Sequence, residues 1–259
     1  MDIETARKLN RINADFYSAN AVSFSASRER PWPGWRRCLE LLADDAVLRQ
    51  GGLRVLDLAC GNLRFEEFLL AELPATGFEF HAVDNNAALP VYSRLAASAS
   101  VLTFQELDIV AALLAGKDLG EAISAGPFDL SVCFGFLHHV PTDVYRQAVL
   151  QALVDKTRPG GYVIASFWQF MVDPGLAAQA EAGHQQALRE LGLPELDQGD
   201  YLLGWQNTAK AWRYCHSFTD DETVALANNL ADKAEPVASF YADGRTGSLN
   251  SYLLLRVTG

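Results

Sequence analysis

Short apolar runs alternate with helix-like periods through the middle of the chain. Apolar runs cover residues 53–58, 77–83, 100–107, 128–134 and 162–167, and helical patterns cover 65–73, 90–97 and 145–156. A nearly continuous apolar run is typical of a strand that is buried on both faces of a parallel sheet. The alternation therefore predicts right-handed strand–helix–strand crossovers and an α/β fold with a doubly wound, mostly parallel sheet.

The flanking segments follow other patterns. The first fifty residues predict two helices around a turn at 28–34, where Pro31 and Pro33 fix φ and remove amide donors. Residues 169–212 break the alternation, with a helix predicted at 176–191 and then a loop rich in glycine, proline and aspartate. A helix at 220–231 and two strands at 236–241 and 248–257 follow, and the glycine-bearing turn between these strands is a hairpin signal.

These patterns predict one domain over residues 1–259. Its parts are a helical cap (1–50), a cofactor-binding core (53–167), an insertion over the substrate end of the sheet (169–212), and a C-terminal helix with an antiparallel hairpin (213–259). With the hairpin, the sheet is expected to have seven strands.

Composition narrows the possible partners. Apolar residues make up 49% and charged residues 20%, as in soluble globular proteins, and the net charge of −11 counts against large nucleic-acid footprints and anionic membranes. The four cysteines show no C-x-x-C spacing, which predicts reduced thiols and no zinc site. The first residues do not resemble a signal peptide, and no apolar stretch approaches a membrane span. We expect a cytoplasmic protein without metal or membrane partner.

Candidate chemistry gathers where the predicted strands end. Asp57 closes the first strand, and Gly61 in the following turn lets the backbone approach a ligand closely. Asp84, next to Asn85, closes the second strand about twenty positions later, where a carboxylate accepts hydrogen bonds from ribose hydroxyls. The third strand ends at Asp108 and Ile109, which are placed to meet an adenine amine.

The glycine pattern distinguishes between nucleotide cofactors. Dinucleotide-binding turns show three glycines, whereas Ala59 and Leu63 occupy the outer positions here and crowd the turn. A single central glycine favours S-adenosylmethionine, with S-adenosylhomocysteine as product, because that cofactor has no pyrophosphate to seat on a helix N-terminus. A nicotinamide-dependent dehydrogenase remains an alternative. Taken singly, Asp84 is also interpretable as a helix cap and Asp108 as a turn residue.

Three segments resemble successive motifs of class I methyltransferases: 55–62, 128–130 with 137–140, and 158–161. The resemblance covers residues 53–167 and implies a Rossmann-like fold with S-adenosylmethionine bound at the turn of residues 57–61. Phe134, at the end of the fourth strand, is included among the expected cofactor-binding residues.

A narrower resemblance concerns residues 28–33 and 212–218. They are similar to two segments of the wobble-uridine tRNA methyltransferases, which esterify the carboxylate of 5-carboxymethyluridine. This implies tRNA modification. Eukaryotic members need a small zinc-protein activator, and this sequence indicates none. The acidic charge and the lack of a lysine or arginine run depart from a tRNA-binding protein, so a small carboxylic acid remains an alternative acceptor.

The same resemblance implies roles for individual residues. Arg28 would hold the methionine carboxylate of the cofactor, with Tyr17 covering it, and His139 would lie at the edge of the methyl-transfer site. Arg213 would clamp the acceptor carboxylate, for which a planar two-pronged donor is suited. Tyr214 and His216 would line the same pocket.

Alternatives remain open for these residues. Arg213 also fits an ion pair with Asp220 or Asp221, and His138 fits a core position. An amine or phenol acceptor would make His139 a general base. A cofactor-binding regulatory module without catalysis is the non-enzymatic alternative.

Overall fold

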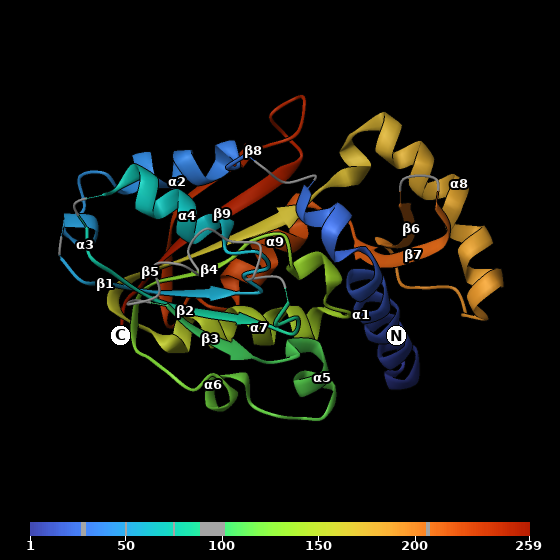
Figure 1. The fold of residues 1–259 in the computed structure, drawn as a ribbon, viewed down its shortest axis with the longest axis horizontal. Coiled ribbons are helices and arrows are strands. Elements are labelled where there is room, and N and C mark those ends of the chain that lie inside the picture. Colours follow the sequence, from blue (N-terminus) through green and yellow to red (C-terminus); the bar gives the residue numbers. More distant parts are fainter. Residues whose placement is uncertain (27–29, 50, 75, 89–101, 206–207) are drawn as a thin grey trace.

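The computed structural model describes residues 1–26, 30–49, 51–74, 76–88, 102–205 and 208–259. Within these residues, seven strands form one sheet in the order β3-β2-β1-β4-β5-β9-β8 (Figure 1). The strands are β1 (Leu53–Leu58), β2 (Phe78–Asp84), β3 (Leu102–Glu106), β4 (Phe128–Cys133), β5 (Thr157–Trp168), β8 (Ala234–Ala242) and β9 (Asn250–Val257).

The pairing of the strands matches the α/β expectation. The first five strands are parallel, and β1 lies between β2 and β4, with Val55 opposite both Phe80 and Leu130. The last two strands are antiparallel, and β9 lies between β5 and β8. The doubly wound, mostly parallel sheet of seven strands with a C-terminal antiparallel hairpin is therefore confirmed.

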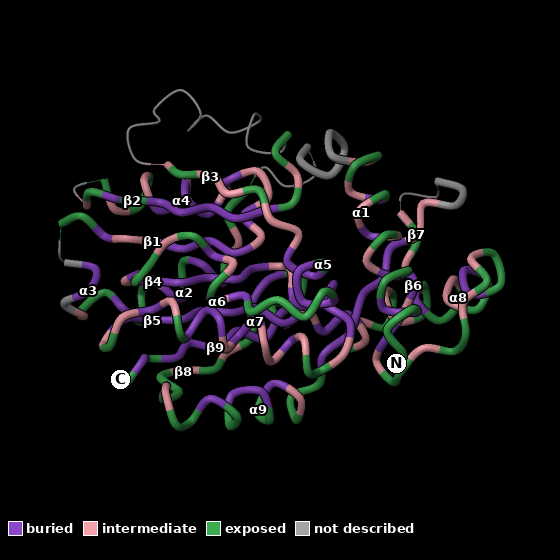
Figure 2. The backbone as a smooth tube through the Cα atoms, turned by 90° about the horizontal axis from the view of Figure 1, so that it is seen from below, coloured by how far each residue is buried: buried purple, intermediate pink, exposed green. Residues whose placement is uncertain are grey.

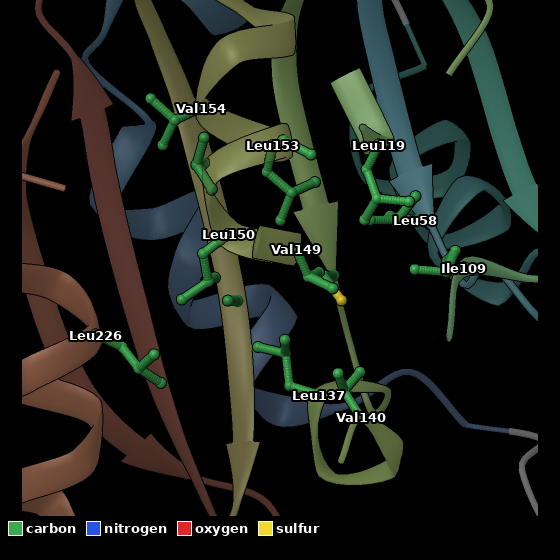
Figure 3. Close-up of a cluster of buried hydrophobic side chains, with 14 of the residues drawn as sticks. Leu58, Ile109, Leu119, Leu137, Val140, Val149, Leu150, Leu153, Val154 and Leu226 are labelled. Atoms are coloured by element: carbon green, nitrogen blue, oxygen red, sulfur yellow. The ribbon is translucent and has the colours of Figure 1, made fainter. Parts of the chain in front are cut away.

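Two helical layers enclose the sheet because side chains alternate along each strand. Leu53 and Val55 of β1 join a cluster with α2 (Pro33–Leu42), α3 (Ala46–Arg49) and α4 (Arg64–Glu72). Leu56 and Leu58 join the cluster on the other face, with α5 (Ile109–Leu114), α6 (Leu119–Ala122), α7 (Asp143–Lys156) and α9 (Asp220–Asn228). Figure 3 shows Val149, Leu150, Leu153 and Val154 of α7 in the second cluster. Figure 2 shows the central strands buried along most of their length.

A smaller lobe stands beyond the carboxyl ends of the parallel strands (Figure 1). It consists of α8 (Pro174–Leu191) packed on a separate antiparallel pair, β6 (Asp200–Trp205) and β7 (Thr208–His216). The N-terminal helix α1 (Ile3–Ala26) contacts β7 and α5, and so lies between this lobe and the sheet. Asn13 of α1 clamps the backbone of Tyr214: its Oδ1 accepts from the amide at 2.7 Å, and its Nδ2 donates to the carbonyl at 3.2 Å.

Several local expectations need correction. The loop expected after residue 191 contains β6, which pairs with β7, and β7 runs across the expected boundary between residues 212 and 213. The short helices α3, α5 and α6 were not anticipated, and α9 ends at Asn228 rather than at 231. Gly160 and Gly161 lie inside β5 instead of preceding it. The helix expected at 90–97 lies outside the described residues.

Candidate functional site

The chain reverses direction directly after β1. The N–H groups of Ala59 and Cys60 both donate to the carbonyl oxygen of Val83, at 2.8 and 3.1 Å, which ties the turn to the end of β2. Gly61 has a φ of +57°, a conformation that glycine adopts without a steric penalty. A Cβ built on Gly61 would meet no atom within 4 Å, so it would project into open space. The turn therefore leaves its backbone accessible to a ligand.

The carboxylate of Asp84 fastens this turn from the neighbouring strand. Its Oδ2 accepts from the Gly61 N–H at 2.9 Å, and its Oδ1 accepts from the Asn86 N–H at 3.0 Å. Burial raises the pKa of Asp84, and these backbone hydrogen bonds oppose the shift. Asp84 thus both positions Gly61 and lines the cavity described below.

Asp108 caps the helix that follows β3. Its Oδ1 accepts from the Ala111 N–H at 2.8 Å, and Asn10 of α1 donates to its Oδ2 at 3.3 Å. Capping satisfies an amide at the start of α5 and fixes the carboxylate at the end of the strand. Asp108 is therefore the N-cap of α5 rather than a simple turn residue, and it lines the cavity described below.

A cavity with about 1130 Å³ of empty space, part of it open to solvent, runs along this edge of the sheet toward α1. The sequence-predicted residues that line it are Tyr17, Asp57, Ala59, Gly61, Asp84, Asn85, Asp108, Ile109, Phe134 and His139. Arg28 lies outside the described residues. Arg213, Tyr214 and His216 do not line this cavity.

Sequence reasoning gave no role to several other lining residues: Asn10, Asn13, Trp32, Trp35, Asn62, Arg64 and Phe136. Trp32 stands inside a segment that the narrower resemblance used, and Arg64 stands two positions after the first methyltransferase motif, so an aromatic and a basic residue there were an available signal. Asn10 and Asn13 gave no such signal. They are polar positions on a helix whose partner surface is unknown before folding.

Beneath the turn lie two buried carboxyl groups. Glu66 is fully buried, and neither of its carboxyl oxygens has a hydrogen-bond partner among the described residues. Burial raises the pKa of Glu66 well above its usual range, and the nearby Asp57 carboxylate adds to this effect. Burial and the charge of Asp84 also raise the pKa of Asp57. Since two adjacent buried carboxylates repel each other, the pair favours holding a proton.

His139 stands where the cavity meets α1, on the short helical turn Leu137–His139 after β4. Its Nδ1 lies 2.8 Å from the carbonyl oxygen of Tyr214, and its Nε2 lies 2.6 Å from the Tyr17 hydroxyl. Because a carbonyl only accepts, Nδ1 carries the proton and Nε2 accepts from the phenol in the neutral ring. The Tyr214 carbonyl therefore favours the tautomer of His139 that is protonated at Nδ1.

Arg213 lies next to this pair and is 7% exposed. Its guanidinium carbon is 5.2 Å from the ring centroid of Trp205 and 5.5 Å from those of Phe16 and Trp168. The Tyr17 hydroxyl lies close to this guanidinium. Burial opposes the charge of Arg213, but neighbouring Cys215 and Tyr17 raise its pKa overall.

No carboxylate in the described part of the chain forms an ion pair with Arg213, and its Nε has no hydrogen-bond partner there. Asp220, one of the two partners considered from sequence, instead accepts hydrogen bonds from Gln169 and Tyr241, at 2.8 and 2.6 Å. Arg213 is thus a buried cation held by aromatic rings.

Tyr214 and His216 point to the opposite face of β7, so the expected shared pocket with Arg213 does not form. The hydroxyl of Tyr214 bonds to Asp200 at 2.8 Å and to Arg146 at 3.0 Å. His216 bonds through Nδ1 to Asp200 at 2.7 Å and through Nε2 to Glu222 at 3.0 Å. Glu222 also caps α9 through Thr219. These residues connect β6, β7, α7 and α9.

The structure also brings together His138, His139 and Cys215, whose ligand atoms lie within 4.8 Å of one another. The sequence spacing did not suggest this cluster. Both ring nitrogens of His139 are committed to hydrogen bonds with Tyr214 and Tyr17. The cluster therefore reads as part of the packing around His139.

Comparison with known proteins identifies the core. Residues 56–163 match the family model described as "Methyltransferase domain". No curated protein matches the chain. A SAM-dependent methyltransferase from Methanosarcina mazei is 17% identical with a TM-score of 0.57, over 81% of this chain and 93% of that chain.

Two further solved structures hold S-adenosylhomocysteine. An N-methyltransferase from Bradyrhizobium japonicum is 12% identical with a TM-score of 0.53, over 90% of this chain and 91% of that one. The 1,6-didemethyltoxoflavin-N1-methyltransferase of Burkholderia thailandensis is 19% identical with a TM-score of 0.52, over 95% of this chain and 90% of that one. At these identities the likeness shows the fold, and the family match supplies the activity.

The cavity suits the cofactor that these findings imply. S-adenosylmethionine needs acceptors for ribose hydroxyls and for an ammonium group, a close approach to backbone, and apolar walls. The strand-end carboxylates, Gly61 and Phe134 provide them. Residues 56–163 match a methyltransferase domain, and the protein is an S-adenosylmethionine-dependent enzyme.

Proposed function

We propose that this methyltransferase transfers the methyl group to a carboxylate oxygen, and that Arg213 binds that carboxylate. The observation that carries the proposal is a buried guanidinium among three aromatic rings with no carboxylate partner in the described residues. Burying a charge without a counter-ion costs several kcal/mol. An anionic acceptor would offset this cost, and Arg213 lies beside Tyr17 and His139, which line the cofactor cavity.

Methyl transfer to a carboxylate requires the protein mainly to align the carboxylate oxygen with the methyl group. A carboxyl group with an ordinary pKa of about 4 is ionised at neutral pH, so no general base is required. Bound S-adenosylmethionine supplies an electrophilic methyl group on its sulfonium. Arg213 would orient the attacking oxygen, and the surrounding rings would exclude water. Positioning of this kind is worth up to ~7–11 kcal/mol in well-aligned reactions.

We further propose that the acceptor is a small carboxylic acid. The net charge of −11 disfavours a polyanionic partner. The Burkholderia thailandensis neighbour has 1,6-didemethyltoxoflavin bound. Similarity of residues 28–33 and 212–218 to the wobble-uridine enzymes supports a nucleoside carboxylate in tRNA instead, which makes tRNA the competing outcome of the test.

The first experiment uses methyl-labelled S-adenosylmethionine with separated tRNA and small-molecule extract fractions, followed by mild alkali. A methyl ester releases volatile label, whereas N-methyl and aryl ether products retain it. Volatile label from the small-molecule fraction supports both parts of the proposal. Volatile label from tRNA would support a carboxylate acceptor but reject the small acid. Alkali-stable label alone would reject a carboxylate acceptor.

Replacing Arg213 by methionine separates a binding role from a structural one. Methionine keeps most of the apolar stem and removes a buried charge, so we expect unchanged or higher thermal stability. Methyl transfer should fall by at least about 100-fold because the acceptor loses its alignment, while cofactor affinity stays the same. Arg7→Gln, at an exposed pair with Glu4, is the matched control. Wild-type transfer by the Arg213→Met variant would reject the role.

One observation favours a second acceptor class. Tyr17 donates to His139 Nε2 at 2.6 Å while Nδ1 is anchored to the Tyr214 carbonyl, an arrangement suited to accepting a proton from an amine or phenol. Such an enzyme would give alkali-stable product. Tyr17→Phe and His139→Asn would then each lower transfer by about 10²–10⁴-fold. With a carboxylate acceptor, transfer by Tyr17→Phe should depend little on pH between about 6 and 8.

A further inference from the structure

Arg64 is the first residue of α4, three positions after Gly61, and its side chain lies on a pair of tryptophans. The guanidinium carbon is 5.5 Å from the ring centroid of Trp32 and 5.2 Å from that of Trp35. Its Nη1 donates to the carbonyl oxygen of Arg30 at 3.0 Å. These contacts hold a long side chain in one place, since stacked rings and a carbonyl fix the plane of the guanidinium.

Arg64 forms no ion pair with a carboxylate in the described part of the chain. It is the one lysine or arginine among the described residues that line the cofactor cavity. Its only hydrogen bond within the described residues is the one to Arg30, and no carboxylate there forms an ion pair with it. Burial lowers the pKa of Arg64 to about 10, with Asp57 opposing the shift, so the group stays charged at neutral pH. The remaining N–H groups are available to a ligand in the cavity.

The strand order places Arg64 apart from Asp84 and Asp108 along the edge of the sheet. Because β3, β2, β1 and β4 lie side by side, their carboxyl ends form a row. Asp108 and Asp84, expected to meet adenine and ribose, occupy the β3 and β2 positions of this row. A cofactor with its adenosine part at these two positions would place its methionine part over β1 and toward β4.

Trp32 contacts both Arg64 and the segment that follows β4. A Cβ built on Gly135, just after β4, would lie 2.8 Å from Cη2 of Trp32. The tryptophan under Arg64 therefore reaches across the end of β4, on the side away from Asp84 and Asp108. The cation of the cavity therefore lies toward β4, away from Asp84 and Asp108.

We propose that Arg64 binds the α-carboxylate of the methionine part of S-adenosylmethionine, from its seat on Trp32 and Trp35. The cofactor carries one carboxylate, and the cavity offers this one cation among its described lining residues. A planar guanidinium matches a carboxylate through two parallel hydrogen bonds. The inference rests on S-adenosylmethionine as cofactor and not on the identity of the acceptor.

The test measures binding by calorimetry with two ligands. S-adenosylmethionine and its decarboxylated form differ only in the carboxylate, and both keep the ammonium group. Arg64→Gln should weaken the first by about 10- to 100-fold, as expected for a lost charge-assisted pair, and leave the second within about twofold. Arg64→Lys keeps the charge but not the fork, so it should lose affinity for the first ligand by a smaller factor. Arg37→Gln, at an exposed pair with Glu40, serves as control and should change neither.

Each outcome of the binding test indicates a different role for Arg64, and a failure of this inference can be told apart from a failure of the proposed function. Equal weakening of both ligands by Arg64→Gln, with Arg64→Lys behaving alike, would assign the residue to packing of the tryptophans and overturn the inference. No effect of either variant would overturn it too. Selective loss in Arg28→Gln with none in Arg64→Gln would transfer the role to Arg28. Because the readout is binding, it stands whether or not the acceptor is a carboxylate.

Discussion

Ala59 and Leu63 occupy the outer positions of the cofactor turn, and both have a positive φ, at 66° and 61°. Left-handed backbone costs a residue with a Cβ about 1–2 kcal/mol. Leu63 is fully buried with Cys60 and Ala82, so packing offsets its strain, and it does not crowd the cavity as expected from sequence. Ala59 does line the cavity.

Because Leu63 is packed in the core and Ala59 lines the cavity, a glycine should change the stability of the protein in opposite directions at these two positions. Ala59→Gly relieves strain and loses little packing, so the free energy of unfolding should rise by about 0.5–1 kcal/mol. Leu63→Gly also relieves strain but empties a core position, so the free energy of unfolding should fall by at least about 2 kcal/mol. Urea denaturation at neutral pH measures both. A gain in stability from Leu63→Gly would show that strain outweighs packing in this turn.

At the scale of elements, the two faces of β7 separate residues that adjoin in sequence. Arg213 and Cys215 face the aromatic rings and His139, and Tyr214 and His216 face Arg146 and Asp200. Side chains of a strand alternate, so a motif of neighbouring residues cannot all reach one pocket. The motif resemblance placed them together because β7 was not anticipated as a strand.

His216 is expected to act on stability rather than on cofactor binding. Burial lowers its pKa, but hydrogen bonds to Asp200 and Glu222 raise it overall. A raised pKa in the folded state means that the protonated form stabilises the fold. This contribution is complete below the unfolded value of about 6.5 and is lost as pH rises through the folded pKa.

His216→Gln should therefore lower the free energy of unfolding by about 1–3 kcal/mol at about pH 6 and by less at about pH 9. Thermal melts across this range measure the difference, and the affinity for S-adenosylmethionine should stay unchanged. If the variant keeps wild-type stability but loses transfer, His216 belongs to the acceptor site after all.

Across the whole molecule, the sheet carries the cofactor cavity at its carboxyl edge, and α1 with the α8–β6–β7 lobe stands over that edge (Figure 1). Arg213 comes from this lobe, and the cofactor turn comes from the sheet. The molecule as a whole is strongly acidic. No helix in the described ranges is long and apolar enough to cross a membrane.

The net charge of the protein predicts how the rate of methyl transfer responds to salt concentration. With a small acid as acceptor, the rate should change by less than about threefold between 50 and 200 mM salt, because a buried site is weakly screened. An enzyme that grips tRNA through six to ten phosphates would lose about 10³–10⁵ in affinity over that range. Steady-state rates at subsaturating acceptor, at the two salt concentrations, check this. A steep fall would favour tRNA.

Local patterns in the sequence determined the parallel core, the C-terminal hairpin and the acidic strand ends at Asp57, Asp84 and Asp108. Each depends on residues a few positions apart, and strand ends of a parallel sheet meet at one edge whatever the details. Only the tertiary structure decided which residues surround His139 at the end of the cavity. Asn13 and Tyr214 are 201 positions apart and Tyr17 and His139 are 122 apart, so no local signal foretells their contacts. The seat of Arg64 on two tryptophans and the aromatic enclosure of Arg213 likewise arise from packing between distant segments.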